Sequence, residues 1–129
     1  MRLTVVSNNP LVRARWADRV EIRFVDGTYR DVLLTVRDLC HAGRLLLSHP
    51  LSGSVKPNET PYKSVLLSGT AGKTDADSIS LIGDAILCCE KFGPLRRAWR
   101  EKELEDFQLV DLCLIESALE SALEDLRNL

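Results

Sequence analysis

Short apolar runs alternate with amphipathic stretches along the first part of the chain. Leu3–Val6, Leu45–Leu47 and Val65–Leu67 are continuous apolar runs, which is typical of strands buried on both faces. Residues 20–25 alternate apolar and polar positions instead, and the turn residues Asp26-Gly27 follow them. The pattern therefore predicts about four strands, one of them half-buried.

Helical periodicity fills the segments between these strands. Helices are predicted over about 10–18, 31–43 and 75–93. Asn9 suits the N-cap of the first helix, and Gly43 suits the left-handed cap that ends the second. Strands that alternate with helices indicate βαβ units, so we expect an α/β fold with a mainly parallel, Rossmann-like sheet of about four strands flanked by helices.

The chain is expected to form one domain over residues 1–129. Residues 1–93 would be its α/β core, and residues 94–129 a C-terminal segment with one long helix. Packing of this helix on the chain's own core is the favoured interpretation, and a homodimer seam is the alternative. The apolar residues of its narrow seam recur at spacings of three and four: Leu112, Ile115, Leu119, Ala122, Leu126 and Leu129.

Composition narrows the class of partner. Of the 129 residues, 45% are apolar and 28% charged, which excludes a disordered or low-complexity chain. The 17 basic residues are outnumbered by 19 acidic ones, giving a net charge of -2. A nucleic-acid-binding domain would carry a basic excess, so no nucleic acid is expected as a partner.

The lengths of the apolar runs and the positions of the cysteines indicate the cellular compartment. The apolar run at the N-terminus is far shorter than a signal-peptide core, and no stretch approaches the roughly 20 apolar residues of a membrane helix. The cysteines Cys40, Cys88, Cys89 and Cys113 lie among apolar residues, which favours core thiols over metal ligands. We therefore expect a cytoplasmic protein without membrane contact, metal or cofactor.

Residues 48–63 form a long segment without periodicity that contains three prolines. Loops of this length in compact domains are usually functional or disordered. In a parallel sheet this loop would begin at the edge where strands end and ligands bind, so we predict a site there for a small polar or anionic ligand or a partner protein. The candidate binding residues are Ser7, Asn8, Asn9, His49, Ser52, Gly53, Ser54, Lys56, Asn58, Glu59, Thr60, Ser68 and Gly69.

A catalytic role for this loop is the alternative. His49 could exchange protons near neutral pH, and Ser52 or Ser54 would be the nearest hydroxyl, as in a small hydrolase or transferase. A histidine beside a proline in a loop is more often structural, however. The segment Gly72-Lys73-Thr74 lacks the earlier glycine of a phosphate-binding loop, because Leu67 occupies that position. Since no established catalytic motif is present, a non-enzymatic role is favoured.

Three segments resemble the GrdX-like family: Ser7–Pro10, Val25–Tyr29 and, most specifically, His49–Val65. The resemblance runs from the first predicted strand through the third predicted helix. It implies a small accessory protein of the anaerobic glycine, sarcosine or betaine reductase systems, with a reductase-related protein as one candidate partner. It assigns no catalytic residues. The chain resembles none of the selenocysteine or redox-dithiol motifs of the reductase subunits, so an accessory role is implied.

Overall fold

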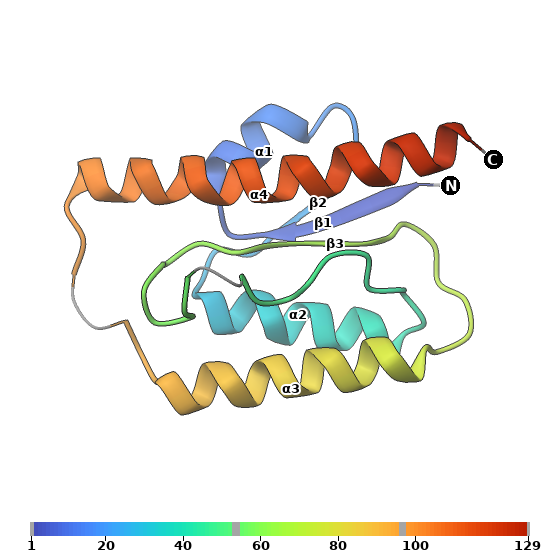
Figure 1. Ribbon diagram of the computed structural model, residues 1–129, viewed down its shortest axis with the longest axis horizontal. Coiled ribbons are helices and arrows are strands. Elements are labelled where there is room, and N and C mark those ends of the chain that lie inside the picture. The colour runs from blue at the N-terminus through green and yellow to red at the C-terminus, as the bar shows by residue number, and fades with distance from the viewer. Residues whose placement is uncertain (1, 53–54, 96–97, 129) are drawn as a thin grey trace.

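A mixed sheet of three strands forms the middle layer of the molecule (Figure 1). The strands are β1 (Leu3–Ser7), β2 (Glu21–Phe24) and β3 (Ser64–Ser68), in the order β2-β1-β3. β1 runs parallel to β2, with Val5 opposite Ile22, and antiparallel to β3. This computed structural model describes residues 2–52, 55–95 and 98–128.

The prediction of a mainly parallel, Rossmann-like sheet of about four strands was wrong. The α/β class and the long C-terminal helix are present, but the sheet has three strands and β3 is antiparallel to its neighbour. A parallel β3 would need a crossover connection, usually a helix, before it. The described part of residues 48–63 contains no helix. This loop reverses the direction of the chain, so that β3 runs antiparallel to Leu46 at an isolated bridge to Leu67, and antiparallel to β1.

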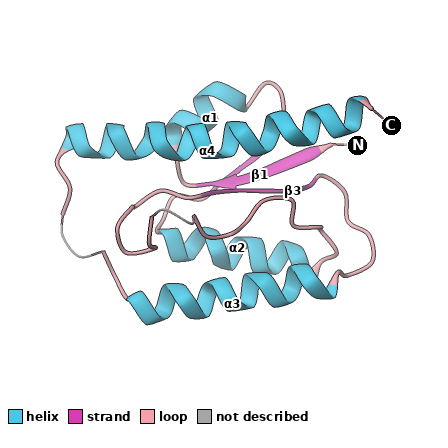
Figure 2. Cartoon of the chain, in the orientation of Figure 1, coloured by secondary structure: helices cyan, strands magenta, loops and turns pink. Residues whose placement is uncertain are grey.

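The apolar run Leu45–Leu47 is not a strand. It makes one isolated antiparallel bridge, from Leu46 to Leu67, and Figure 2 shows the connection between α2 and β3 as a loop. Leu45 and Leu47 are 43% and 37% exposed, so the segment is not buried on both faces. These apolar residues therefore lie in a partly exposed segment beside β3 and do not form a buried strand.

Two helices cover one face of the sheet, α2 (Tyr29–His41) and α3 (Ala76–Phe92) (Figure 1). Both begin at capping side chains that accept a backbone amide: Thr28 from Asp31, and Asp75 from Ser78. Between the sheet and these helices lies an apolar core that is fully shielded from solvent at Val6, Val32, Leu33, Val36, Val65, Leu67 and Ile82.

The other face of the sheet is covered by α1 (Pro10–Trp16) and α4 (Glu101–Arg127). The predicted seam of the last helix packs inside the chain at Leu112, Ile115, Leu119, Ala122 and Leu126, with Leu119 completely buried. Leu129, the last predicted seam residue, lies outside the described residues. The partners of the seam on the strands and on α1 are Leu3, Val5, Val12, Trp16 and Leu66. This confirms packing on the chain's own core. Within the described residues, none of the helices combines the length and apolarity needed to cross a bilayer.

The cysteines do not all behave as core thiols. Cys40 and Cys89 are buried in the core under α2 and α3, and burial raises the pKa of both thiols. Cys88 is half-buried, and Cys113 is exposed on α4. The apolar neighbours of Cys113 in the sequence lie on other faces of the helix, so they gave no information about its own burial.

Gly43 ends α2 in the left-handed conformation that its position predicted, with φ of 100°. An added Cβ would also overlap the backbone carbonyl of Gly72. We expect Gly43→Ala to lower the free energy of unfolding by at least about 1 kcal/mol, measured by chemical denaturation. Gly83→Ala is the matched control, because Gly83 lies inside α3 with open space around it.

The control should change stability in the opposite direction. Alanine is favoured over glycine inside a helix by about 1 kcal/mol, so Gly83→Ala should raise the free energy of unfolding. Equal effects of the two substitutions would contradict the assignment of strain to Gly43.

Candidate functional site

Polar side chains meet where β1 ends and β3 begins. Ser7 and Ser64 lie opposite each other in the antiparallel pair, and their hydroxyl oxygens are 2.7 Å apart. The backbone amide of Asn9 also donates to Ser7 Oγ, at 2.9 Å. The polar residues predicted at the end of the first strand therefore lie at one end of the sheet, but they are buried and not open to solvent.

The two asparagines that follow Ser7 hold loops and helices together. Asn8 accepts the backbone amide of Lys63 at 2.9 Å and donates to the carbonyl oxygens of Gly27 and Pro61 at 3.1 and 2.8 Å. Asn9 caps α1, as predicted, by accepting the amide of Leu11 at 3.0 Å. Their amide groups are engaged within the chain, so both residues hold the loops and helices around the site in place.

A buried carboxylate from α4 completes this cluster. Asp111 is 5% exposed; its Oδ1 accepts the backbone amide of Ser64 at 3.0 Å, and its Oδ2 accepts the Ser64 hydroxyl at 2.7 Å and the side-chain amide of Asn9 at 3.0 Å. Burial raises the pKa of Asp111, while these hydrogen bonds and the charge of Lys63 act in the opposite direction. Asp111 thereby links α4 to the start of β3 and, through Asn9, to the N-cap of α1.

Lys63 places a buried cation beside the cluster. The residue is 5% exposed, and its ammonium group donates to Ser52 Oγ at 3.2 Å. Burial lowers the pKa of Lys63, and the negative charge of Asp111 partly offsets that effect. Among the described residues, no carboxylate lies at ion-pair distance from this ammonium group.

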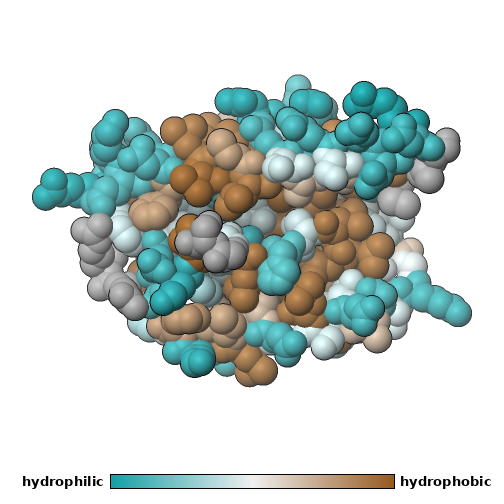
Figure 3. Space-filling view, viewed as in Figure 1, coloured by the Kyte–Doolittle hydropathy of each residue, from teal (hydrophilic) through white to brown (hydrophobic). Residues whose placement is uncertain are grey.

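Lys63 borders a hollow of about 460 Å³ between the start of the long loop and α4. We call this hollow the Lys63 cleft. Figure 3 shows apolar side chains gathered along α4 and below it. The lining of the cleft combines hydroxyl-bearing and apolar residues: Ser48, His49, Leu51, Ser52, Lys63, Ser64, Leu114, Ile115, Ser117, Ala118 and Ser121.

His49 and Ser52 both line the cleft, but the structure does not join them by a hydrogen bond. His49 is exposed, and its Nδ1 lies 3.0 Å from the backbone nitrogen and 2.9 Å from the carbonyl oxygen of Leu51. The hydrogen bond of the Ser52 hydroxyl is made with Lys63 instead. The other ring nitrogen of His49, Nε2, takes part in neither of these contacts.

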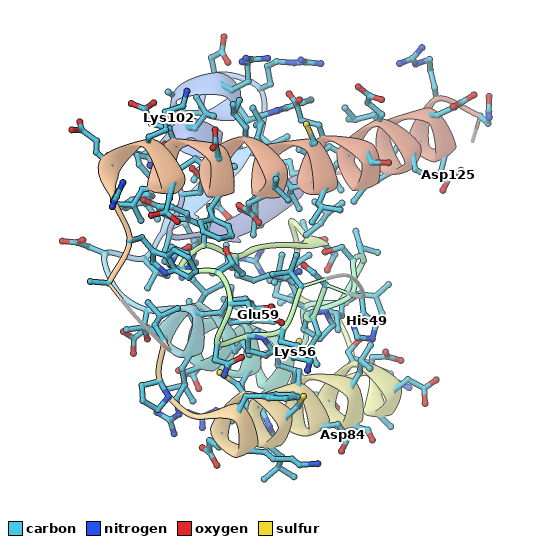
Figure 4. All side chains as sticks on the ribbon, turned by 60° about the vertical axis from the view of Figure 1, so that its left-hand side comes forward. His49, Lys56, Glu59, Asp84, Lys102 and Asp125 are labelled. Carbon is cyan, nitrogen blue, oxygen red and sulfur yellow. The ribbon has the colours of Figure 1, made fainter. Side chains whose placement is uncertain are left out.

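Two of the remaining predicted loop residues, Lys56 and Asn58, fasten the loop to α3. Figure 4 shows His49, Lys56 and Glu59 on the loop that precedes β3, in the space between helices α4 and α3. The amine of Lys56 lies 5.5 Å from the centre of the Phe92 ring, and the side-chain amide of Asn58 donates to the Phe92 carbonyl at 3.3 Å. These are structural contacts away from the cleft.

Two further contacts hold the loop in shape. Glu59 accepts the backbone amide of Lys56 at 3.3 Å, and Thr60 accepts that of Tyr62 at 3.3 Å. Gly53 and Ser54, which were also predicted to bind a ligand, lie outside the described residues.

Ser68 and Gly69 lie at the opposite end of the sheet from the cleft. Ser68 is paired with Leu3, and the amide of Gly69 donates to the carbonyl of Arg2 at 2.6 Å. The expectation that they share an edge with Ser7 and His49 depended on a parallel β3 and was wrong. The antiparallel direction brings the start of β3, with Lys63 and Ser64, to that edge instead.

The fold and its edge thus define a small α/β domain with a partly polar cleft beside one buried lysine. The chain matches the model of the GrdX-like protein family over residues 4–120, and it belongs to that family. The resemblance that the sequence segments carry is confirmed. No curated protein and no solved structure matches the chain.

Proposed function

We propose that this protein binds a small anionic ligand, a carboxylate or a phosphate-bearing compound, in the Lys63 cleft. The observation that carries the proposal is the Lys63 ammonium group, which is buried at the cleft wall and donates to one neutral oxygen, Ser52 Oγ. A buried ammonium group is unfavourable unless it is paired or hydrogen-bonded. A bound anion would supply the missing negative charge.

Asp111 does not fill this role. Three donors from Ser64 and Asn9 already occupy its two oxygens. The carboxylate stabilises the positive charge of Lys63 from a distance but forms no ion pair with it. The cation therefore remains available to a ligand that enters from the cleft.

The cleft has the size and the chemistry for a small molecule. Binding sites for small ligands commonly measure about 300–1,000 Å³, and this cleft measures about 460 Å³. The hydroxyls of Ser117 and Ser121 and the free ring nitrogen of His49 can donate to the oxygens of an anion, and Leu51 and Leu114 offer apolar contact to its carbon skeleton. Such a lining favours a compact, partly apolar anion.

The metabolic setting is part of the same proposal and rests on the family resemblance. An accessory protein of a glycine reductase system would meet glycine and acyl phosphates, both of which carry an anionic group. These two compounds, inorganic phosphate and a nucleotide form the set of probes to test first. A partner protein of the reductase system would contact the same cleft if no small anion binds.

Binding should depend on the charge of Lys63. We expect at least one of glycine, acetyl phosphate, phosphate or ATP to raise the Tm of the wild-type protein in a thermal-shift assay. Lys63→Met should abolish that rise, and Lys73→Met should retain it, because Lys73 is exposed outside the cleft. Binding should weaken as the pH rises through the lowered pKa of Lys63.

Two outcomes would contradict the proposal. If no probe stabilises the wild-type protein, the small-anion function is wrong. If a probe stabilises wild type and Lys63→Met equally, the ligand binds elsewhere and the buried lysine is structural.

A further inference from the structure

A second hollow lies outside the Lys63 cleft and is lined by arginines. It measures about 510 Å³ and lies among β2, α1 and the C-terminal half of α4, with Arg2, Arg13 and Arg19 on its walls. In residues 2–23 the chain carries five arginines and two acidic residues, although its net charge is -2. This segment therefore carries a net charge of +3 (five arginines against two acidic residues) within a chain whose net charge is negative.

Aromatic rings hold two of these arginines in place. The guanidinium carbon of Arg13 lies 3.8 Å from the centre of the Phe24 ring, and that of Arg19 lies 4.2 Å from the centre of the Trp16 ring. Stacking on a ring leaves the N–H groups at the edge of a guanidinium free to donate. The two groups are therefore oriented before any ligand arrives, which reduces the entropy lost on binding.

The arginines of the hollow have little negative charge to neutralise them. Within the described residues, Arg2, Arg13 and Arg19 form no ion pair. The two acidic residues of the hollow are Asp18 and Glu21, and the Glu21 carboxylate is engaged by the Thr4 hydroxyl at 2.6 Å and lies 3.8 Å from Arg44. A ligand with several negative charges would complement this hollow.

The hollow adjoins an unpaired strand edge. β2 is the outer strand of the sheet, beside β1 alone. The amide of Val25 donates to Ser7 at 2.8 Å, so by the alternation of a strand the amides of Ile22 and Phe24 point away from β1. An extended peptide could add to this edge through backbone hydrogen bonds.

We infer that the β2 edge and the arginine hollow together bind an extended acidic segment of a partner protein. The edge supplies backbone donors and acceptors, and Arg13 and Arg19 select for carboxylates. Charged side chains beside an edge strand repel strands of like charge, so the arginines also disfavour basic segments. A second copy of this chain is a poor source of such a segment, because its acidic residues between 101 and 127 lie on the helix α4.

The test is a titration in which the full chain is added to a fluorescein-labelled peptide of four Glu-Val repeats at low salt. Fluorescence polarisation of the peptide measures the binding. We expect the Glu-Val peptide to bind at least about tenfold more tightly than a Lys-Val peptide, because each guanidinium–carboxylate contact is a charge-assisted hydrogen bond. The variant Arg13→Gln/Arg19→Gln should lose that advantage. The control Arg37→Gln/Arg127→Gln removes the same charge from exposed positions that do not line the hollow and should bind like wild type.

The backbone contribution is tested with two N-methylated versions of the Glu-Val peptide, one for each alternate set of amides. One version should lose binding, because its methyl groups face the β2 edge, and the other should retain it. Equal binding of both to the parent peptide would overturn strand addition. Three other results would overturn the inference as well. The Lys-Val peptide could bind as tightly as the Glu-Val peptide, or the Arg13→Gln/Arg19→Gln variant could bind like wild type. A helical peptide with the sequence of residues 101–127 could also bind as tightly as the Glu-Val peptide.

Discussion

Replacing Asp111 with alanine is expected to lower the free energy of unfolding by about 2–4 kcal/mol. The substitution removes the acceptor of the Ser64 backbone amide and one partner each of the Ser64 hydroxyl and the Asn9 side chain. A buried polar group left without a partner costs about 1–3 kcal/mol, and the Ser64 amide has no second acceptor among the described contacts. Chemical denaturation measures the loss.

The matched control for this substitution is Asp106→Ala. Asp106 lies on the same helix but is exposed, so its removal should change stability by no more than about 0.5 kcal/mol. Similar effects of the two substitutions would show that the buried carboxylate does not hold α4 to the sheet.

The contribution of Asp111 should also depend on pH. Burial raises its pKa in the folded state, so the folded protein retains the proton at pH values where the unfolded chain has lost it. The stability that depends on this residue is therefore greatest below the ordinary carboxyl pKa and decreases as the pH rises through the raised pKa. The difference between wild type and Asp111→Ala should be larger at acidic than at neutral pH.

Local features of this fold follow from the sequence because they depend on neighbouring residues. The cap at Asn9 and the left-handed Gly43 were predicted from residue type and position, and both are present. The direction of β3 is set over a longer range. It depends on whether the chain crosses over the sheet between residues 48 and 63, and the absence of helical periodicity there was the available signal that it does not.

The residues of the candidate site were also predicted only in part from the sequence. His49 and Ser52 were predicted from the polar loop, and both line the Lys63 cleft. Asp111 was missed because it is one of nine acidic residues between positions 101 and 127, where a solvated face is the usual interpretation. A signal existed, since Asp111 is the one charged residue in the stretch 107–115. An isolated charge in an apolar stretch of a packed helix indicates a buried polar contact.

The position of Lys63 could not be derived in this way. It ends the loop that also carries Lys56, and nothing in the sequence separates the two lysines. The structure does so through Asn8, which accepts the Lys63 backbone amide and so places that residue against the start of β3. Lys56 remains exposed beside α3. Contacts between residues far apart in the chain therefore decide which cation becomes part of the cleft.

The second large effect is expected at the seam of α4. Leu119 is completely buried against the sheet and α1, so Leu119→Ala should lower the free energy of unfolding by about 2–5 kcal/mol through lost apolar contact and the cavity left behind. Leu109 lies on the same helix but is 51% exposed, and Leu109→Ala should change stability by less than about 1 kcal/mol. Chemical denaturation of both variants compares them directly.

A comparison of wild type with Leu119→Ala also distinguishes a seam inside one chain from a seam between two copies. If Leu119 packs only within its own chain, the Tm of wild type and of Leu119→Ala should not depend on protein concentration, because folding is then unimolecular. A Tm that rises with concentration in wild type and loses that dependence in Leu119→Ala would assign the seam to a second copy. The burial of Leu112, Ile115 and Leu119 against β1, β3 and α1 leads us to expect the first result.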